Sequence, residues 1–139
     1  MTYVNAGHMP TLLFRRSDGA LQDLRSGGMA LGVLPDIEFE QRVVQLQDGD
    51  TLVFYTDGVI EASNAQQEMF GRERLIRTVR ACQGQSAQEI AAAVDQALIQ
   101  FVGDAPQFDD LTLVVANCCV GPVPSDGSES YVEGRCVNP

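Results

Sequence analysis

The first half of the chain is organised in short apolar runs that predict β-strands. Candidate strands cover residues 3–6, 11–15, 20–24, 39–46 and 51–55. The turn signal Ser17-Asp18-Gly19 separates the second run from the third and is typical of a β-hairpin. Gln47-Asp48-Gly49-Asp50 separates the last two runs in the same way, so a second hairpin is expected there. Residues 26–36, rich in Gly and Pro, predict an irregular loop.

After residue 60 the spacing of apolar residues becomes helical. The segment 70–82 carries apolar side chains at positions 75, 76, 79 and 82, which predicts an amphipathic helix. Ser86 and Glu89 fit a capping box, and apolar residues then recur every three or four positions until Gly103. A last apolar run, 111–116, predicts a strand that returns to the sheet. Two helices therefore follow four or five strands.

Composition places the chain among globular proteins. It has 139 residues, 45% of them hydrophobic and 20% charged, which suits one domain with one core. The sequence contains no apolar run of about 20 residues and no basic, apolar start typical of a signal peptide, so we expect a cytoplasmic location. Residues 120–139 are rich in Gly, Pro, Ser and acidic residues, and predict a flexible tail.

The formal net charge of −10 disfavours binding to nucleic acid or to an anionic membrane surface. The four cysteines show no C-x-x-C spacing typical of a zinc site, and the adjacent Cys118 and Cys119 would point to opposite faces of a strand. We therefore expect idle thiols.

Carboxylates stand at the ends of two apolar strands. Asp57 follows the run 52–55, and Asp109 and Asp110 directly precede the run 111–116. If the two strands are neighbours in suitable directions, these carboxylates converge at one sheet edge, where clustered oxygens favour Mg²⁺, Mn²⁺ or Ca²⁺. The alternative is that Asp57 belongs to a turn and Asp109 to the entry of a strand, both common uses of Asp.

Two further residues are candidates for chemistry. Glu61, four residues after Asp57, either lies beside the carboxylates or is a solvated surface residue. His8 is the single histidine and is either an acid or base near neutral pH or a turn and packing residue.

Several motifs occur together in an order that is more specific than any one of them. They are Tyr3-Val4-Asn5-Ala6-Gly7-His8, Leu31-Gly32-Val33, residues 48–62 with Tyr55-Thr56-Asp57-Gly58-Val59-Ile60-Glu61-Ala62, Phe70-Gly71, and Asp109-Asp110-Leu111-Thr112. Over residues 2–118 they resemble the SpoIIE/RsbU branch of the PPM metal-dependent serine/threonine phosphatases. The resemblance implies an α+β fold, part of an α-β-β-α sandwich with antiparallel sheets and two covering helices.

The resemblance also implies a site and a reaction. Asp57 and Asp109 correspond to metal ligands for Mn²⁺ or Mg²⁺, with two ions expected in the complete domain, and Asp110 lies beside the site. Gly58, Glu61 and His8 are further candidates for positions next to the metal ligands. A metal-bound water attacks the phosphorus of a phosphoserine or phosphothreonine, so no side chain is itself the nucleophile. The implied substrate is a phosphorylated bacterial signalling protein, such as an anti-sigma-factor antagonist.

One departure from the family affects these expectations. The family carries a further metal-bridging Asp in a D-x-x-G-x-G-like segment of its first half, and this sequence has no such segment. Residues 1–119 are therefore expected to be the C-terminal portion of a phosphatase domain, with activity of its own in question. The alternative is a non-catalytic interaction module. A calcium-binding domain is less consistent, because no D-x-[DN]-x-[DN]-G loop is present.

A sandwich cut through its middle leaves strand edges and an apolar face uncovered. We therefore expect a homodimer, whose contacts come from residues 3–6 and 52–55 and which could exchange strands, or else a poorly soluble fragment.

Overall fold

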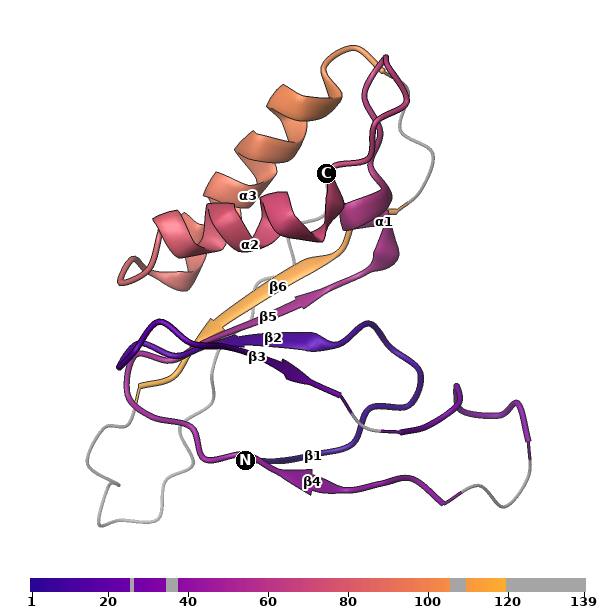
Figure 1. Cartoon of the computed structure of the whole chain (residues 1–139), viewed down its shortest axis with the longest axis vertical. Coiled ribbons are helices and arrows are strands. Elements are labelled where there is room, and N and C mark those ends of the chain that lie inside the picture. The colour runs from indigo at the N-terminus through magenta and orange to yellow at the C-terminus, as the bar shows by residue number, and fades with distance from the viewer. Residues whose placement is uncertain (26, 35–37, 106–109, 120–139) are drawn as a thin grey trace.

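A computed structural model describes residues 1–25, 27–34, 38–105 and 110–119 of the chain. Its helices and strands are shown in Figure 1. In chain order they are β1 (Thr2–Tyr3), β2 (Thr11–Phe14), β3 (Leu21–Leu24), β4 (Arg42–Val43), β5 (Thr51–Tyr55), α1 (Asp57–Glu61), α2 (Gly71–Ala81), α3 (Ala87–Val102) and β6 (Leu113–Asn117).

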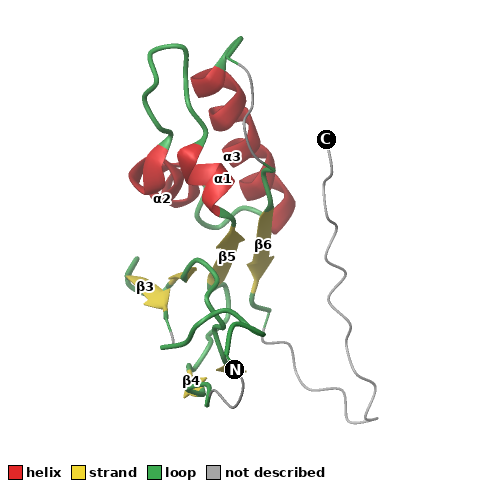
Figure 2. Cartoon of the chain, turned by 90° about the vertical axis from the view of Figure 1, so that its right-hand side faces the viewer, coloured by secondary structure: helices red, strands yellow, loops and turns green. Residues whose placement is uncertain are grey.

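The strands form two antiparallel sheets. The larger has the order β3-β2-β5-β6, and the smaller pairs β1 with β4. Helices α2 and α3 lie over one face of the larger sheet, and the small sheet lies on the other side (Figures 1 and 2). The architecture is α+β with antiparallel sheets and covering helices, as the sequence predicted.

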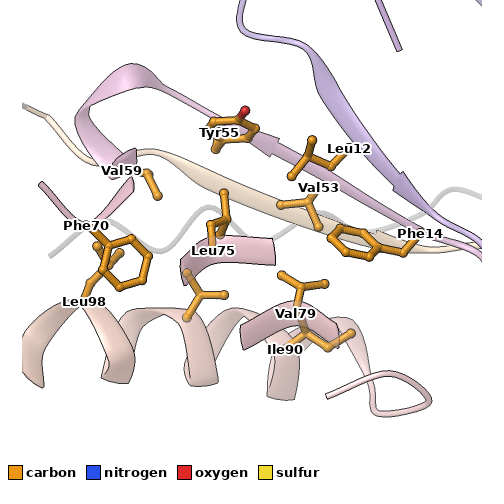
Figure 3. Close-up of a cluster of buried hydrophobic side chains, with 11 residues drawn as sticks. Leu12, Phe14, Val53, Tyr55, Val59, Phe70, Leu75, Val79, Ile90 and Leu98 are labelled. Carbon is orange, nitrogen blue, oxygen red and sulfur yellow. The ribbon is translucent and has the colours of Figure 1, made fainter. Parts of the chain in front are cut away.

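The main core lies between the larger sheet and the helices (Figure 3). Residues of one parity on β2 and β5 point to this side, because successive side chains of a strand alternate between its faces. They pack against the buried stripes of α2 and α3. The fully buried members include Leu12, Phe14, Val53, Tyr55, Leu75, Val79, Ile90 and Val94.

The opposite face of the sheet is only partly covered. Leu13, Leu24 and Leu52 form a second cluster with Val44, next to the small sheet. Phe54, on the same face of β5 as Leu52, remains 37% exposed. Burial of this face is therefore incomplete toward the end of β5.

This arrangement corrects part of the expected dimer contact. Strand β5 lies between β2 and β6, so its backbone is already paired on both sides and offers no free strand edge to another chain. Exposed apolar side chains do remain at Val4, Val43 and Phe54. The homodimer itself stays a prediction.

The first predicted hairpin is correct and the second is wrong. β2 and β3 pair in the register Leu12 opposite Asp23, around the expected turn. Residues 47–50 do form a turn, in which Gly49 has a φ of +78° and the Asp50 N–H donates to the Gln47 carbonyl. However, β4 pairs with β1 and β5 pairs with β2 and β6, so this turn connects two different sheets.

A buried carboxylate explains why the turn does not close a hairpin. Asp50 is fully buried and forms an ion pair of 2.7 Å with Arg15, which follows β2. The same carboxylate accepts hydrogen bonds from the backbone N–H groups of Gln47 and Arg16. The turn is thereby fastened to the β2–β3 hairpin, because Phe14 lies opposite Thr51 and Arg15 comes next to Asp50.

The helical predictions are confirmed to within one residue at most boundaries. The capping box is present: the Ser86 hydroxyl accepts from the Glu89 N–H, and the Glu89 carboxylate accepts from the Ser86 N–H. The Ser86 hydroxyl and the Ser86 N–H both donate to the Glu89 carboxylate and hold its pKa below its usual range. The short helix α1 was not predicted, because the sequence indicated only a turn after Asp57.

Some expectations fall outside the described residues. They concern residues 26 and 35–37 of the irregular loop, Asp109, and the tail 120–139. Residues 27–34 contain neither helix nor strand, as expected. Within the described ranges, none of the helices combines the length and apolar character required to traverse a bilayer.

The Asp50–Arg15 pair predicts a specific pH dependence of stability. Burial alone raises the pKa of Asp50, but the hydrogen bonds from Gln47, Arg16 and Arg15 outweigh it, so the pKa lies below the ordinary value of 3.8. A group with a lowered pKa stabilises the fold above its unfolded pKa and loses this contribution as the pH falls through the folded value. We expect Asp50→Asn to lower the free energy of unfolding by about 3 kcal/mol at pH 7.

The measurement is urea unfolding of both proteins at pH 7, 5, 4 and 3. The difference between them should shrink as the pH falls below about 4. Asp95→Asn, at an exposed position on α3, serves as the control and should change little. A difference that stays constant across this range would contradict the assignment.

Candidate functional site

The site is built where β5 ends and β6 begins. These strands are antiparallel neighbours, and Tyr55 lies opposite Leu113 in the last pair of the ladder. One more backbone hydrogen bond continues the pairing, from the Thr56 N–H to the Thr112 carbonyl at 3.1 Å. The segments that carry Asp57 and Asp110 therefore meet at one sheet edge, which was the condition for their convergence.

The Thr56 hydroxyl fastens the two segments together. It accepts a hydrogen bond from the Thr112 N–H at 3.1 Å and donates one to the Asp110 carbonyl at 3.3 Å. Thr56 is also the N-cap residue of α1, yet its side chain makes no capping bond to that helix. The hydroxyl instead forms hydrogen bonds to the segment before β6. The sequence interpretation did not predict this contact.

Asp57 is the first residue of α1 and is exposed. Its Oδ1 lies 3.1 Å from the N–H of Gly58, which is buried. Val59 is fully buried in the helix-side core and anchors the helix. Glu61 is exposed one turn after Asp57, and residues four apart share a helix face, so both carboxylates stand on the outer face of α1.

Asp110 is exposed, and its backbone is held by Thr56. Asp109, the second expected metal ligand, lies outside the described residues. Its role as a ligand stays a prediction, supported by its place next to Asp110 in the chain.

His8 lies in a turn before β2. Its N–H donates to the Asn5 side chain at 2.8 Å, the Asn5 amide donates back to the His8 carbonyl at 3.0 Å, and its Nδ1 is 2.9 Å from the Met9 carbonyl. The ring is exposed. Because Leu12 lies opposite Val53, the segment before β2 reaches the same sheet edge as the end of β5. His8 therefore lies at this edge, and its hydrogen bonds fit a turn residue, while a role as acid or base stays a prediction.

The carboxylates at this edge match a divalent cation in the type of donor atom. Asp57 and Asp110 offer carboxylate oxygens, which are the ligands that Mg²⁺ and Mn²⁺ prefer. In the described ranges, however, no three Asp, Glu, His or Cys side chains come together as a metal cluster. The residues fit a cation in chemical type, but a full ligand set needs groups beyond those described, and Asp109 as one of them stays a prediction.

Two further polar groups lie at opposite ends of the same sheet. The Tyr55 hydroxyl is buried and has no hydrogen-bond partner among the described residues. Burial raises the pKa of the Cys118 thiol at the opposite end of the sheet, and the Asp50 carboxylate adds to the effect, which disfavours the reactive thiolate form.

Comparison with known proteins gives the family. The model of the family "Stage II sporulation protein E (SpoIIE)" matches residues 1–118. The chain belongs to the SpoIIE family. It is 36% identical over 114 residues to Protein IcfG of Synechocystis sp. and 31% identical over 114 residues to Phosphoserine phosphatase RsbU of Bacillus subtilis.

Solved structures agree with the fold. The phosphatase domain of SpoIIE from Bacillus subtilis, solved with a fragment of its regulatory domain, matches with a TM-score of 0.67 at 21% identity, covering 84% of this chain and 33% of that one. The SiaA-PP2C domain of Pseudomonas aeruginosa matches with a TM-score of 0.65 at 26% identity, covering 80% of this chain and 44% of that one.

The relatives are longer than the matched region. The alignments cover 82% of this chain, but only 18% of IcfG and 33% of RsbU. The chain thus spans a third or less of the curated relatives it matches.

The Thr56 hydroxyl gives a testable prediction. Thr56→Val keeps the shape but removes one donor and one acceptor, so we expect a loss of about 1–2 kcal/mol in the free energy of unfolding. Hydrogen exchange of the Thr112 amide should become faster, since its acceptor is gone. Thr56→Ser keeps the hydroxyl and should restore most of the protection. Equal protection of Thr112 in Thr56→Val and the original chain would contradict this role.

Proposed function

We propose that this chain contributes the metal-binding edge of a phosphoserine/phosphothreonine protein phosphatase. The observation that carries the proposal is the meeting of the Asp57 and Asp110 segments at one sheet edge, joined by Thr56, in a member of the SpoIIE family. Either Mn²⁺ or Mg²⁺ would suit the oxygen donors. The relative RsbU is named a phosphoserine phosphatase, which supports the reaction class.

In this proposal Asp57 and Asp109 hold the cation, and two ions are expected in the complete domain. When bound, such ions lower the pKa of an attacking water and offset negative charge on the phosphoryl oxygens. Thr56 sets the separation of the ligand-bearing segments. The Gly58 N–H donates to the Asp57 carboxylate, and Asp110, Glu61 and His8 lie around the edge as groups that could accept hydrogen bonds from coordinated water.

The substrate in this proposal is a phosphorylated signalling protein of bacteria, with an anti-sigma-factor antagonist as the specific candidate. The second candidate function is a non-catalytic interaction module. It is favoured by the small donor set, since the described residues do not by themselves surround a cation.

The metal assignment is tested by calorimetric titration of the chain with Mn²⁺. We expect Asp57→Asn and Asp109→Asn each to weaken binding about tenfold or more, because each removes a charged ligand. Asp95→Asn, on the exposed face of α3, is the matched control and should bind as the original chain does. Equal binding in all four proteins would exclude this pair as ligands.

The reaction is tested in a complete phosphatase domain that contains this chain. We expect Mn²⁺-dependent release of phosphate from a phosphoserine protein, and a fall in kcat of about a hundredfold or more in Asp57→Asn. A folded, metal-loaded domain that releases no phosphate from any phosphoprotein would instead support the interaction module.

A further inference from the structure

A shallow groove lies between α2 and α3. The residues that face the sheet, Leu75 and Val79 on α2 and Val94 and Leu98 on α3, are buried in the core. The groove lies beside this buried stripe and has a volume of about 310 Å³. It is distinct from the Asp57–Asp110 edge.

The groove has an aromatic floor. Phe70 is buried and meets the half-buried Phe101 edge-to-face, with ring centroids 5.6 Å apart. The Arg74 guanidinium lies 4.5 Å from the centre of the Phe101 ring. Its Nη1 donates to the carbonyls of Met69 and Phe70, both at 2.9 Å. Arg74 is thus held in place while its other N–H groups remain available to an acceptor.

The charge of the groove is opposite to that of the chain. α2 contains four Arg and one Glu, a net charge of +3, in a chain whose net charge is −10. Arg74 and Arg77 line the groove, and Arg77 is exposed and forms no ion pair with a described residue. The α3 wall is neutral, with Ala97 and Gln100, so it does not cancel these charges.

We propose that this groove binds a short acidic segment of a partner protein. Carboxylates of the partner pair with Arg74 and Arg77, and an apolar side chain packs on Phe101. The length of α2 suits a short segment, because its 11 residues extend about 16 Å, which is the length of roughly five residues of extended peptide.

Other polyanions fit less well. A nucleic acid or a membrane surface is larger than the groove and would also approach the acidic remainder of the chain. Like charges repel within about 8–10 Å, so these partners are disfavoured. A short peptide contacts the basic groove alone. The proposal does not depend on metal binding or phosphatase activity.

The test measures binding of a fluorescein-labelled peptide of alternating Glu and Leu to the 139-residue chain by fluorescence anisotropy. The matched peptide has Gln in place of each Glu. We expect the Glu peptide to bind, the Gln peptide to bind at least about tenfold more weakly, and added salt to weaken the Glu peptide.

Two pairs of variants localise the binding. Arg77→Gln and Arg80→Gln remove the same charge from exposed positions of α2, but only Arg77 lines the groove. Gln100→Glu and Gln96→Glu add the same charge to α3 without changing size, and only Gln100 lines the groove. We expect Arg77→Gln and Gln100→Glu each to weaken binding about tenfold, and their controls to change it less than about twofold.

Thermal unfolding should be unchanged in all four variants, because each position is exposed. Absence of binding by the original chain, equal binding of the Gln peptide, or equal effects within either pair would overturn the proposal. Light scattering that shows the groove variants disrupting a dimer of the chain would overturn it too, because a second copy would then be the occupant.

Discussion

The pairing of β5 with two neighbours is the constraint on which the rest of the structure depends. Its register with β2 places Arg15 next to Asp50 and fastens the turn between the sheets. Its register with β6 brings Thr56 next to Thr112 and so forms the candidate site. The two ends of one strand therefore hold a buried ion pair and a carboxylate edge, and a one-residue slip would disrupt both and turn Val53 and Tyr55 out of the core.

Local signals predicted most of the elements, and long-range pairing accounts for the errors. The capping box at Ser86 and the turn at Ser17-Asp18-Gly19 act within a few residues, so the sequence shows them directly. The turn at residues 47–50 has equally good local chemistry, but the strands beside it join different sheets. The apolar run 52–55 held the missing information, because a strand with apolar residues on both faces is expected inside a sheet and not in an isolated hairpin.

The sequence predicted the carboxylates of the site, but not the hydrogen bonds that hold their two segments together. Asp57 follows one apolar strand, and Asp110 precedes another. Because β5 and β6 pair as antiparallel neighbours, this order places both carboxylates at one edge of the sheet. Thr56 carries no such signal. A Thr before a short helix is ordinarily a cap, and only the position of β6 shows that its hydroxyl bonds across the strands instead.

The carboxylate edge and the basic groove are physically connected through the segment between α1 and α2. This segment closes on itself by the Phe70 N–H bond to the Ala62 carbonyl, at 2.7 Å, and by a bridge between Ser63 and Met69. Arg74 binds the carbonyls of Met69 and Phe70 at the base of this loop. Arg74 therefore both supplies charge to the groove and fixes the return of the chain from α1. Its replacement would disturb both surfaces at once, whereas Arg77, with no role in the loop, reports on the groove alone.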